Sequence, residues 1–205
     1  MEIPVDILEK CHAEGVAAYP EEACGFISGT SSDQDLLDAV WPMRNIMNDL
    51  HEKDPKLNPR TARDGYLIDP LEQLKLERLL KKKGKEIKVI YHSHPDVGAY
   101  FSEKDKEDAL WNGKARYPGV KFLVCGTTKG KPDGAIIAEF NQDSSDFDII
   151  PINDNSKETL ADIVGGVFGI TGILPTIDFI HKWKNGDLEL QHGYFRFVKQ
   201  RQIRD

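Results

Sequence analysis

Two histidines separated by a single residue, His92 and His94, limit most strongly what this chain can fold into. The stretch Lys88–Tyr91 before them is typical of a buried strand. Side chains alternate between the two faces of a strand, so both imidazoles are expected on the same face. Two ring nitrogens placed in this way can reach a single metal ion.

A capping-box pattern follows the histidines and predicts that a helix begins at Ser102. The first turn of that helix can bring the Asp105 carboxylate back toward the strand end. Two neutral histidine nitrogens and one carboxylate make three protein ligands, and a hydrolytic zinc site keeps its fourth position for water. Taken alone, Ser102 and Asp105 are explained as a helix cap and a first-turn acid, so the prediction depends on the whole set.

A further carboxylate, Glu22, is expected at a corner between a helix and a strand. The helix predicted over Val5–Ala18 is stopped by Pro20, and a strand is predicted to start at Gly25. A carboxylate at such a corner can project into a cleft. The alternative is a solvated surface acid, which is what we expect of the neighbouring Glu21.

Together these segments resemble the JAMM (MPN-plus) metallopeptidase family, in particular its stand-alone prokaryotic branch. The resemblance covers about residues 1 to 150, and the tract Gly65–Pro70 also resembles the small bacterial and archaeal members. All positions of the family motif are present: Glu22, Cys24, Gly25, His92, His94, Pro95, Ser102 and Asp105.

The resemblance implies a deaminase-like fold and hydrolysis of a peptide or isopeptide bond after the C-terminal Gly-Gly of a ubiquitin-like or sulfur-carrier protein. We expect one Zn²⁺ per chain, bound by His92, His94 and Asp105. Glu22 is the motif carboxylate left free to act as general base. Ser102 can donate a hydrogen bond to the carbonyl oxygen on which negative charge develops.

Two other functions remain open at this point. A non-catalytic MPN-type scaffold usually lacks some of the ligands, and the intact set argues against it. A zinc amidase acting on small amides or cell-wall peptides is the other alternative, although the sequence carries no recognisable wall-hydrolase domain.

Composition limits the partners and the compartment. The 205 residues carry a net charge of -7, and an acidic chain is a poor nucleic-acid binder, since phosphate contacts need clustered Lys and Arg. The N-terminus lacks the cationic and apolar regions of a signal peptide, so we expect a cytoplasmic protein without membrane association. Three cysteines fit a reducing compartment, and the sequence leaves open whether Cys24 and Cys125 pair.

Helical and strand patterns interleave, which predicts an α/β sandwich with a central mixed sheet. The polar tract Asn45–Arg63 contains two prolines and is predicted to be an irregular loop near the site. The other expected helices span Pro70–Lys83 and Ser102–Trp111, and the expected strands span Gly25–Gly29, Ala39–Met43, Ile87–Tyr91, Val120–Gly126, Ala135–Phe140 and Phe147–Ile152.

We divide the chain into a catalytic domain, residues 1–153, and a C-terminal extension, residues 154–205. The extension contains the uncharged, Gly-rich stretch Ile163–Ile177 and a predicted strand pair over Leu188–Val198. Such apolar surface is expected to pack on the catalytic domain or on a second copy of the chain, which would make a homodimer. His181 and His192 are isolated, and we leave both out of the site.

Overall fold

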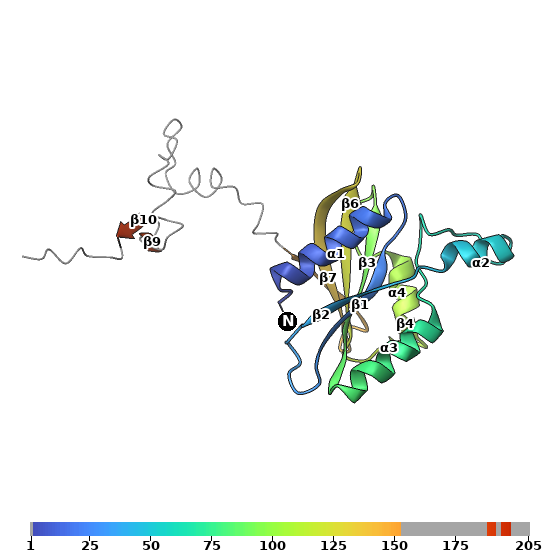
Figure 1. Cartoon of the computed structure of the whole chain (residues 1–205), viewed down its shortest axis with the longest axis horizontal. Helices are drawn as coiled ribbons and strands as arrows, with labels where there is room; N and C mark the ends of the chain where they lie inside the picture. Colours follow the sequence, from blue (N-terminus) through green and yellow to red (C-terminus); the bar gives the residue numbers. More distant parts are fainter. Residues whose placement is uncertain (1, 153–187, 192–193, 198–205) are drawn as a thin grey trace, which may run out of the picture. The chain divides into compact units, whose positions relative to one another are not determined.

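The computed structural model describes residues 2–152, 188–191 and 194–197 (Figure 1). Contacts divide the chain into two units, residues 1–153 and 154–205. In the second unit, strands β9 (Leu188–Gln191) and β10 (Tyr194–Phe197) form the antiparallel pair that the sequence predicted. The stretch Ile163–Ile177 and the two isolated histidines, His181 and His192, lie outside the described residues.

One six-stranded mixed sheet organises the first unit. Its strands follow the order β2-β1-β3-β6-β7-β8, and β3 and β6 run parallel while all other neighbours are antiparallel. This arrangement confirms the predicted α/β class with a central mixed sheet. The strands are β1 (Cys24–Thr30), β2 (Ala39–Met43), β3 (Lys85–Pro95), β6 (Lys121–Thr128), β7 (Lys131–Asn141) and β8 (Asp146–Ile152).

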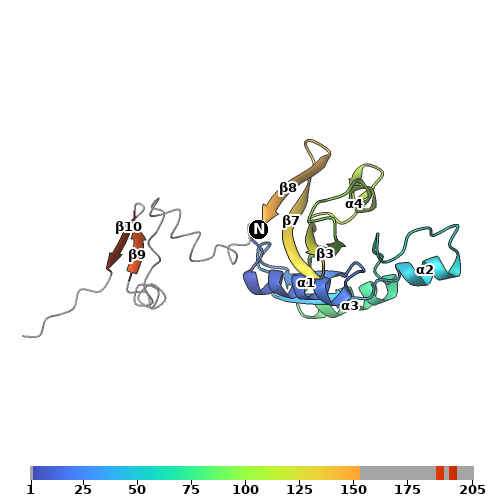
Figure 2. The same ribbon diagram turned by 90° about the horizontal axis from the view of Figure 1, so that it is seen from above.

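Helices cover both faces of the sheet. Helix α1 (Val5–Ala18) lies across one face, as Figures 1 and 2 show, and packs Ile7, Leu8 and Cys11 into the core on that side. Helices α3 (Pro70–Lys82) and α4 (Glu103–Ala109) belong to the core on the opposite face. The residues of β3 alternate between the two cores, which fixes the face from which each of its side chains projects.

Helix α1 approaches the site-bearing end of the sheet closely because Gly15 carries no side chain. A Cβ atom at Gly15 would lie 2.7 Å from Oγ1 of Thr127 and 3.0 Å from Cβ of Ser93. These residues belong to β6 and β3, so the small residue lets the helix rest directly on the two parallel strands.

Two local predictions were wrong. The tract Asn45–Arg63 contains helix α2 (Met47–Lys53), which ends before Pro55 and Pro59 and which both views show set apart from the sheet. The prolines therefore limit the helix rather than prevent it.

The helix predicted over Ser102–Trp111 is also shorter than expected. Helix α4 ends at Ala109, and β4 (Leu110–Trp111) then pairs with β5 (Lys114–Ala115). The two residues between these strands, Asn112 and Gly113, have φ angles of 51° and 72°. An Asn-Gly pair of this kind favours a tight hairpin over a continuing helix.

All three cysteines are buried and free. Cys24 belongs to the core under α3 and α4, whereas Cys125 belongs to the core under α1. The two thiols therefore lie on opposite faces of the sheet and do not pair. In the described part of the chain, the helices are too short or too polar to span a bilayer.

Two adjacent leucines on α3 test this packing. Leu80 is 1% exposed and Leu79 is 40% exposed. Leu80→Ala should lower the free energy of unfolding by about 2–5 kcal/mol, because it leaves a cavity under the sheet. Leu79→Ala is the matched control and should cost less than about 1 kcal/mol. Urea unfolding of both variants measures the difference, and equal losses would contradict the packing described.

Candidate active site

The end of strand β3 presents the two histidines on one face, as the sequence predicted. His92 pairs with Val124 and His94 with Gly126 of the parallel strand β6. Both side chains are buried, and their Nε2 atoms lie 3.0 Å apart. The intervening residue, Ser93, projects from the opposite face toward α1. Strand alternation therefore places His92 and His94 in the site and Ser93 on the other face of the sheet, against α1.

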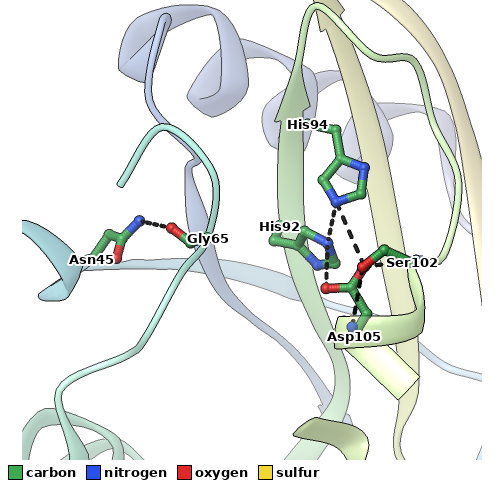
Figure 3. A network of polar contacts seen from close by, with 6 residues as sticks. All are labelled: Asn45, Gly65, His92, His94, Ser102 and Asp105. Atoms are coloured by element: carbon green, nitrogen blue, oxygen red, sulfur yellow. Dashed lines mark hydrogen bonds and ion pairs between the residues drawn. The ribbon is translucent and has the colours of Figure 1, made fainter. Parts of the chain in front are cut away.

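Asp105 faces both imidazoles from the first turn of α4 (Figure 3). Its Oδ1 lies 3.4 Å from Nε2 of His92, and its Oδ2 lies 3.6 Å from Nε2 of His94. The predicted capping box is present: the Ser102 hydroxyl accepts from the Asp105 amide, and the Asp105 carboxylate accepts from the Ser102 amide. The hydroxyl of Ser102 also donates to Oδ2 of Asp105 over 2.6 Å. The helix cap thus holds the carboxylate toward the strand.

Glu22 is buried beside the histidines and is not a solvated acid. It lies between α1 and β1, and its side chain is 7% exposed. Ligand atoms of Glu22, His92 and His94 all lie within 4.8 Å of one another. Glu21, by contrast, accepts a hydrogen bond from Nδ2 of Asn48 on α2. The corner therefore directs one of two adjacent carboxylates into the site.

Backbone hydrogen bonds hold this corner against two distant segments. The Ala23 amide donates to Oγ of Ser93 over 2.8 Å, and the Ser93 amide donates to the Ala23 carbonyl over 2.9 Å. The Glu22 amide donates to the carbonyl of Ala62. Nδ2 of Asn45 donates to the carbonyls of Glu22 and of Gly65, and Figure 3 shows the second of these bonds. The segment after α2 is thereby tied to the Glu22 corner.

Two tyrosines flank the histidine rings. The ring of Tyr66 stacks on His92 with 4.5 Å between centroids, and Tyr100 meets His94 edge-on at 4.9 Å. Sequence reasoning did not assign roles to Asn45, Tyr66 or Tyr100. The tract Gly65–Pro70 had been singled out only for its resemblance to small family members, and it is the segment that carries Tyr66.

Burial and neighbouring charges set different protonation states for the site groups. Burial and, to a smaller extent, the Asp105 charge raise the pKa of Glu22 to about 8, although Arg60 opposes this shift. Burial alone would raise the pKa of Asp105, but hydrogen bonds from His92, His94 and Ser102 outweigh it and lower that pKa. Burial lowers the pKa of His92, although Asp105 opposes this shift. Asp105 is therefore ionised while His92 is neutral at neutral pH.

The donor set fits a zinc ion. In a tetrahedral zinc site with ligand bonds near 2.0–2.1 Å, neighbouring ligand atoms are roughly 3.3 Å apart. The Nε2 atoms of His92 and His94 lie 3.0 Å apart, and each has a different oxygen of Asp105 near it, at 3.4 Å and 3.6 Å respectively. One proton can bridge the two imidazoles, whereas a cation can be bound by both nitrogens and the carboxylate together. These residues therefore form a candidate metal centre.

The thiol near the site does not have the properties of a nucleophile. Burial raises the pKa of Cys24 to about 12, and the Glu22 charge acts in the same direction. A thiol with this pKa stays protonated at neutral pH, and the thiolate is the reactive form. The groups at the site that can take part in chemistry are therefore its carboxylates and its imidazoles.

The chain is similar to several known proteins. The model of a family described as prokaryotic homologs of the JAB domain matches residues 4–137. The desampylase of Haloferax volcanii is 31% identical over 126 residues, which are 61% of this chain and 73% of that protein. A probable TtuB-protein conjugate cleaving protease of Thermus thermophilus is 30% identical over 125 residues, which are 61% of this chain and 69% of the relative.

A solved structure supports the fold alone. A Desulfitobacterium hafniense protein, determined in solution, superimposes with a TM-score of 0.53 at 24% identity, covering 71% of this chain and 86% of its own. The family match confirms the resemblance that the sequence motif suggested, and the solved structure agrees with the fold.

The reciprocal hydrogen bonds between Ser93 and Ala23 generate a prediction. Ser93→Ala removes the acceptor for the Ala23 amide in a part of the chain where Ser93 is 1% exposed. Leaving that amide unpaired should lower the free energy of unfolding by about 1–3 kcal/mol. Ser32→Ala, at an exposed hydroxyl, is the control and should change it by less than about 0.5 kcal/mol. Chemical denaturation measures the free energy of unfolding of both variants. Equal values would show that the bonds between Ser93 and Ala23 do not stabilise this corner.

Proposed function

The chain belongs to the family of prokaryotic homologues of the JAB domain, and from this premise we propose that it is a zinc metallopeptidase. We propose that it hydrolyses the peptide or isopeptide bond that follows the C-terminal Gly-Gly of a ubiquitin-like or sulfur-carrier protein. The observation that carries the proposal is the convergence of His92, His94 and Asp105 beside the buried Glu22.

His92, His94 and Asp105 would hold one zinc ion per chain. Asp105 is favoured over Glu22 as the third ligand because its oxygens lie 3.4 and 3.6 Å from the two Nε2 atoms, close to the separation that zinc requires. When bound, zinc lowers the pKa of a coordinated water and polarises a substrate carbonyl. This assignment leaves Glu22 free to move protons.

Glu22 acts as the general base in this proposal. Its carboxylate takes a proton from the attacking water and later delivers it to the leaving amine. Burial raises its pKa to about 8, and the positive charge of a nearby cation would lower that pKa into the range in which the carboxylate is ionised. Hydrogen bonds to Ala62 and from Asn45 fix the Glu22 backbone, from which this side chain extends into the site.

Ser102 is proposed to stabilise the substrate carbonyl. Its hydroxyl donates to Oδ2 of Asp105, and rotation about a single bond can redirect the same proton to a carbonyl oxygen placed in the site. A donor aimed at an oxygen on which charge develops contributes most when water is excluded. The capping box keeps Ser102 in position while its hydroxyl changes partner.

The substrate class rests on the relatives and on the chemistry of a glycine tail. The two named relatives are a desampylase and a protein that cleaves TtuB-protein conjugates. A tail that ends in two glycines has no side chains to exclude it from a buried site. A non-catalytic scaffold is disfavoured because no position of the metal and base set is missing.

Three further assignments stay predictions. They are a cytoplasmic location, packing of the extension on the catalytic domain or on a second copy, and the resulting homodimer. A chain shortened after Asn153 tests the last two, because loss of the extension should lower the melting temperature or change the mass measured by light scattering. An unchanged melting temperature, mass and turnover would contradict both.

The role of Glu22 can be separated from metal binding. Glu22→Gln should retain the zinc and lower kcat roughly 100-fold to 10,000-fold, because the amide cannot accept the proton of water. Glu21→Gln is the matched control and should retain full activity. Hydrolysis of a ubiquitin-like protein ending in Gly-Gly, fused to a reporter, measures both variants. A fully active Glu22→Gln protein would shift the assignment to Glu21.

Metal content gives an independent prediction. Elemental analysis should find one zinc per chain, and His92→Ala should lose both the zinc and the activity. His51→Ala, outside the site, is the control histidine variant and should keep the metal. Chelation should also lower the melting temperature, since an ion that binds only the native state stabilises it. Wild-type protein without zinc, and unchanged by His92→Ala, would contradict the metal assignment.

A further inference from the structure

A cavity of about 290 Å³ opens beside the candidate active site. Tyr66 lines this cavity and also stacks on His92, so the cavity and the site share one wall. The other lining residues come from α2 and the segment after it, from α3, from the region of α4 and β5, and from the sheet strands β1, β3 and β6. Its apolar walls include Met47, Leu50, Ile90 and Phe122.

Two arginines, Arg60 and Arg116, line the cavity. Within the part of the chain that the structure describes, the side chains of Arg60 and Arg116 make no hydrogen bond or ion pair. The guanidinium of Arg116 lies only over the Tyr117 ring, at 5.9 Å, and that of Arg60 packs next to Gly65. The remaining charges of the wall cancel, because Lys104 pairs with Asp108 over 2.7 Å. The cavity therefore carries a local positive charge in a chain whose net charge is -7.

This combination suits an acidic side chain on an extended peptide. A guanidinium presents several donors in a plane and binds carboxylates in a bidentate manner. The apolar walls can contact the aliphatic part of a glutamate and the peptide that carries it. Each residue of an extended chain advances about 3.3 Å, so residues just before a Gly-Gly at the histidines lie within reach of a neighbouring cavity.

We infer that this cavity selects the substrate, by binding an acidic side chain one or two residues before the terminal Gly-Gly of the ubiquitin-like partner. The inference rests on the proposed function, which places the Gly-Gly carbonyl at the candidate metal centre. Arg60 and Arg116 determine specificity and take no part in the bond cleavage. Two charge-assisted contacts of this kind should change kcat/KM by roughly tenfold.

Three coumarin amides measure the preference on the full-length, zinc-loaded protein. Their acyl groups are acetyl-Glu-Glu-Gly-Gly, acetyl-Gln-Gln-Gly-Gly and acetyl-Lys-Lys-Gly-Gly. Because the leaving group is the same uncharged coumarin, any charge preference arises on the tail side of the scissile bond. We expect kcat/KM to be about tenfold higher for the glutamate substrate than for the glutamine one, and lowest for the lysine one.

Charge reversal in the cavity should abolish or invert this ratio. Arg116→Glu, which reverses one charge, is the main variant, and Arg60→Gln, which removes the other, should weaken the ratio. Arg63→Glu is the matched control, because Arg63 is exposed on the same loop as Arg60 and does not line the cavity. A ratio of substrates cancels any general loss of activity in a variant. Loss of the preference in Arg63→Glu as well would indicate a long-range charge effect and overturn the inference.

A binding measurement keeps the test independent of catalysis. Fluorescein-labelled Glu-Glu-Gly-Gly and Gln-Gln-Gly-Gly, each with a free carboxylate, are titrated with wild type and Arg116→Glu and followed by anisotropy. If the substrates are cleaved without a charge preference, the inference fails while the proposed function stands. If none of the substrates is cleaved, the proposed function fails, and peptide binding alone tests the inference. Tighter binding of the acidic peptide that is lost in Arg116→Glu supports an acidic preference of the cavity. Equal binding of the two peptides overturns it.

Discussion

The Asp105 carboxylate makes the interaction on which the rest of the site depends. It accepts hydrogen bonds from the amide and the hydroxyl of Ser102, which caps the N-terminus of α4. It also faces both histidines at the end of β3. One side chain thus joins the helix to the strand whose period-two alternation aligns His92 and His94. If it were displaced, the helix start, the third donor and the position of Ser102 would change together.

The site holds its two carboxylates in different states by giving them different partners. Asp105 receives hydrogen bonds, which keep its pKa low despite burial. Glu22 is buried with its side chain near other acids, which raises its pKa to about 8. A cation held by Asp105 and the histidines would stabilise the ionised form of Glu22. In the proposed mechanism the two carboxylates therefore take different roles, Asp105 as metal ligand and Glu22 as base.

The parts of the structure that could be predicted are those specified locally in the sequence. The alternation that places His92 and His94, the Ser102–Asp105 cap and the ends of α1 all depend on neighbouring residues. Asn45, Tyr66 and Arg116 reach the site or its cavity only through contacts between distant segments, which no local pattern encodes. Helix α2 is not evident from the sequence because Pro55 and Pro59, which follow it, are typical of a loop. The β4–β5 hairpin is signalled only by the pair Asn112-Gly113, which interrupts an otherwise helical pattern.

Anomalous X-ray scattering at the zinc edge, from crystals of the purified full-length chain, tests the central claim most directly. The account predicts one strong peak within bonding distance of Nε2 of His92, Nε2 of His94 and a carboxylate oxygen of Asp105, with Glu22 near the ion but not bound to it. A peak bonded to Glu22 in place of Asp105, or no peak at these histidines, would contradict the separation of ligand and base.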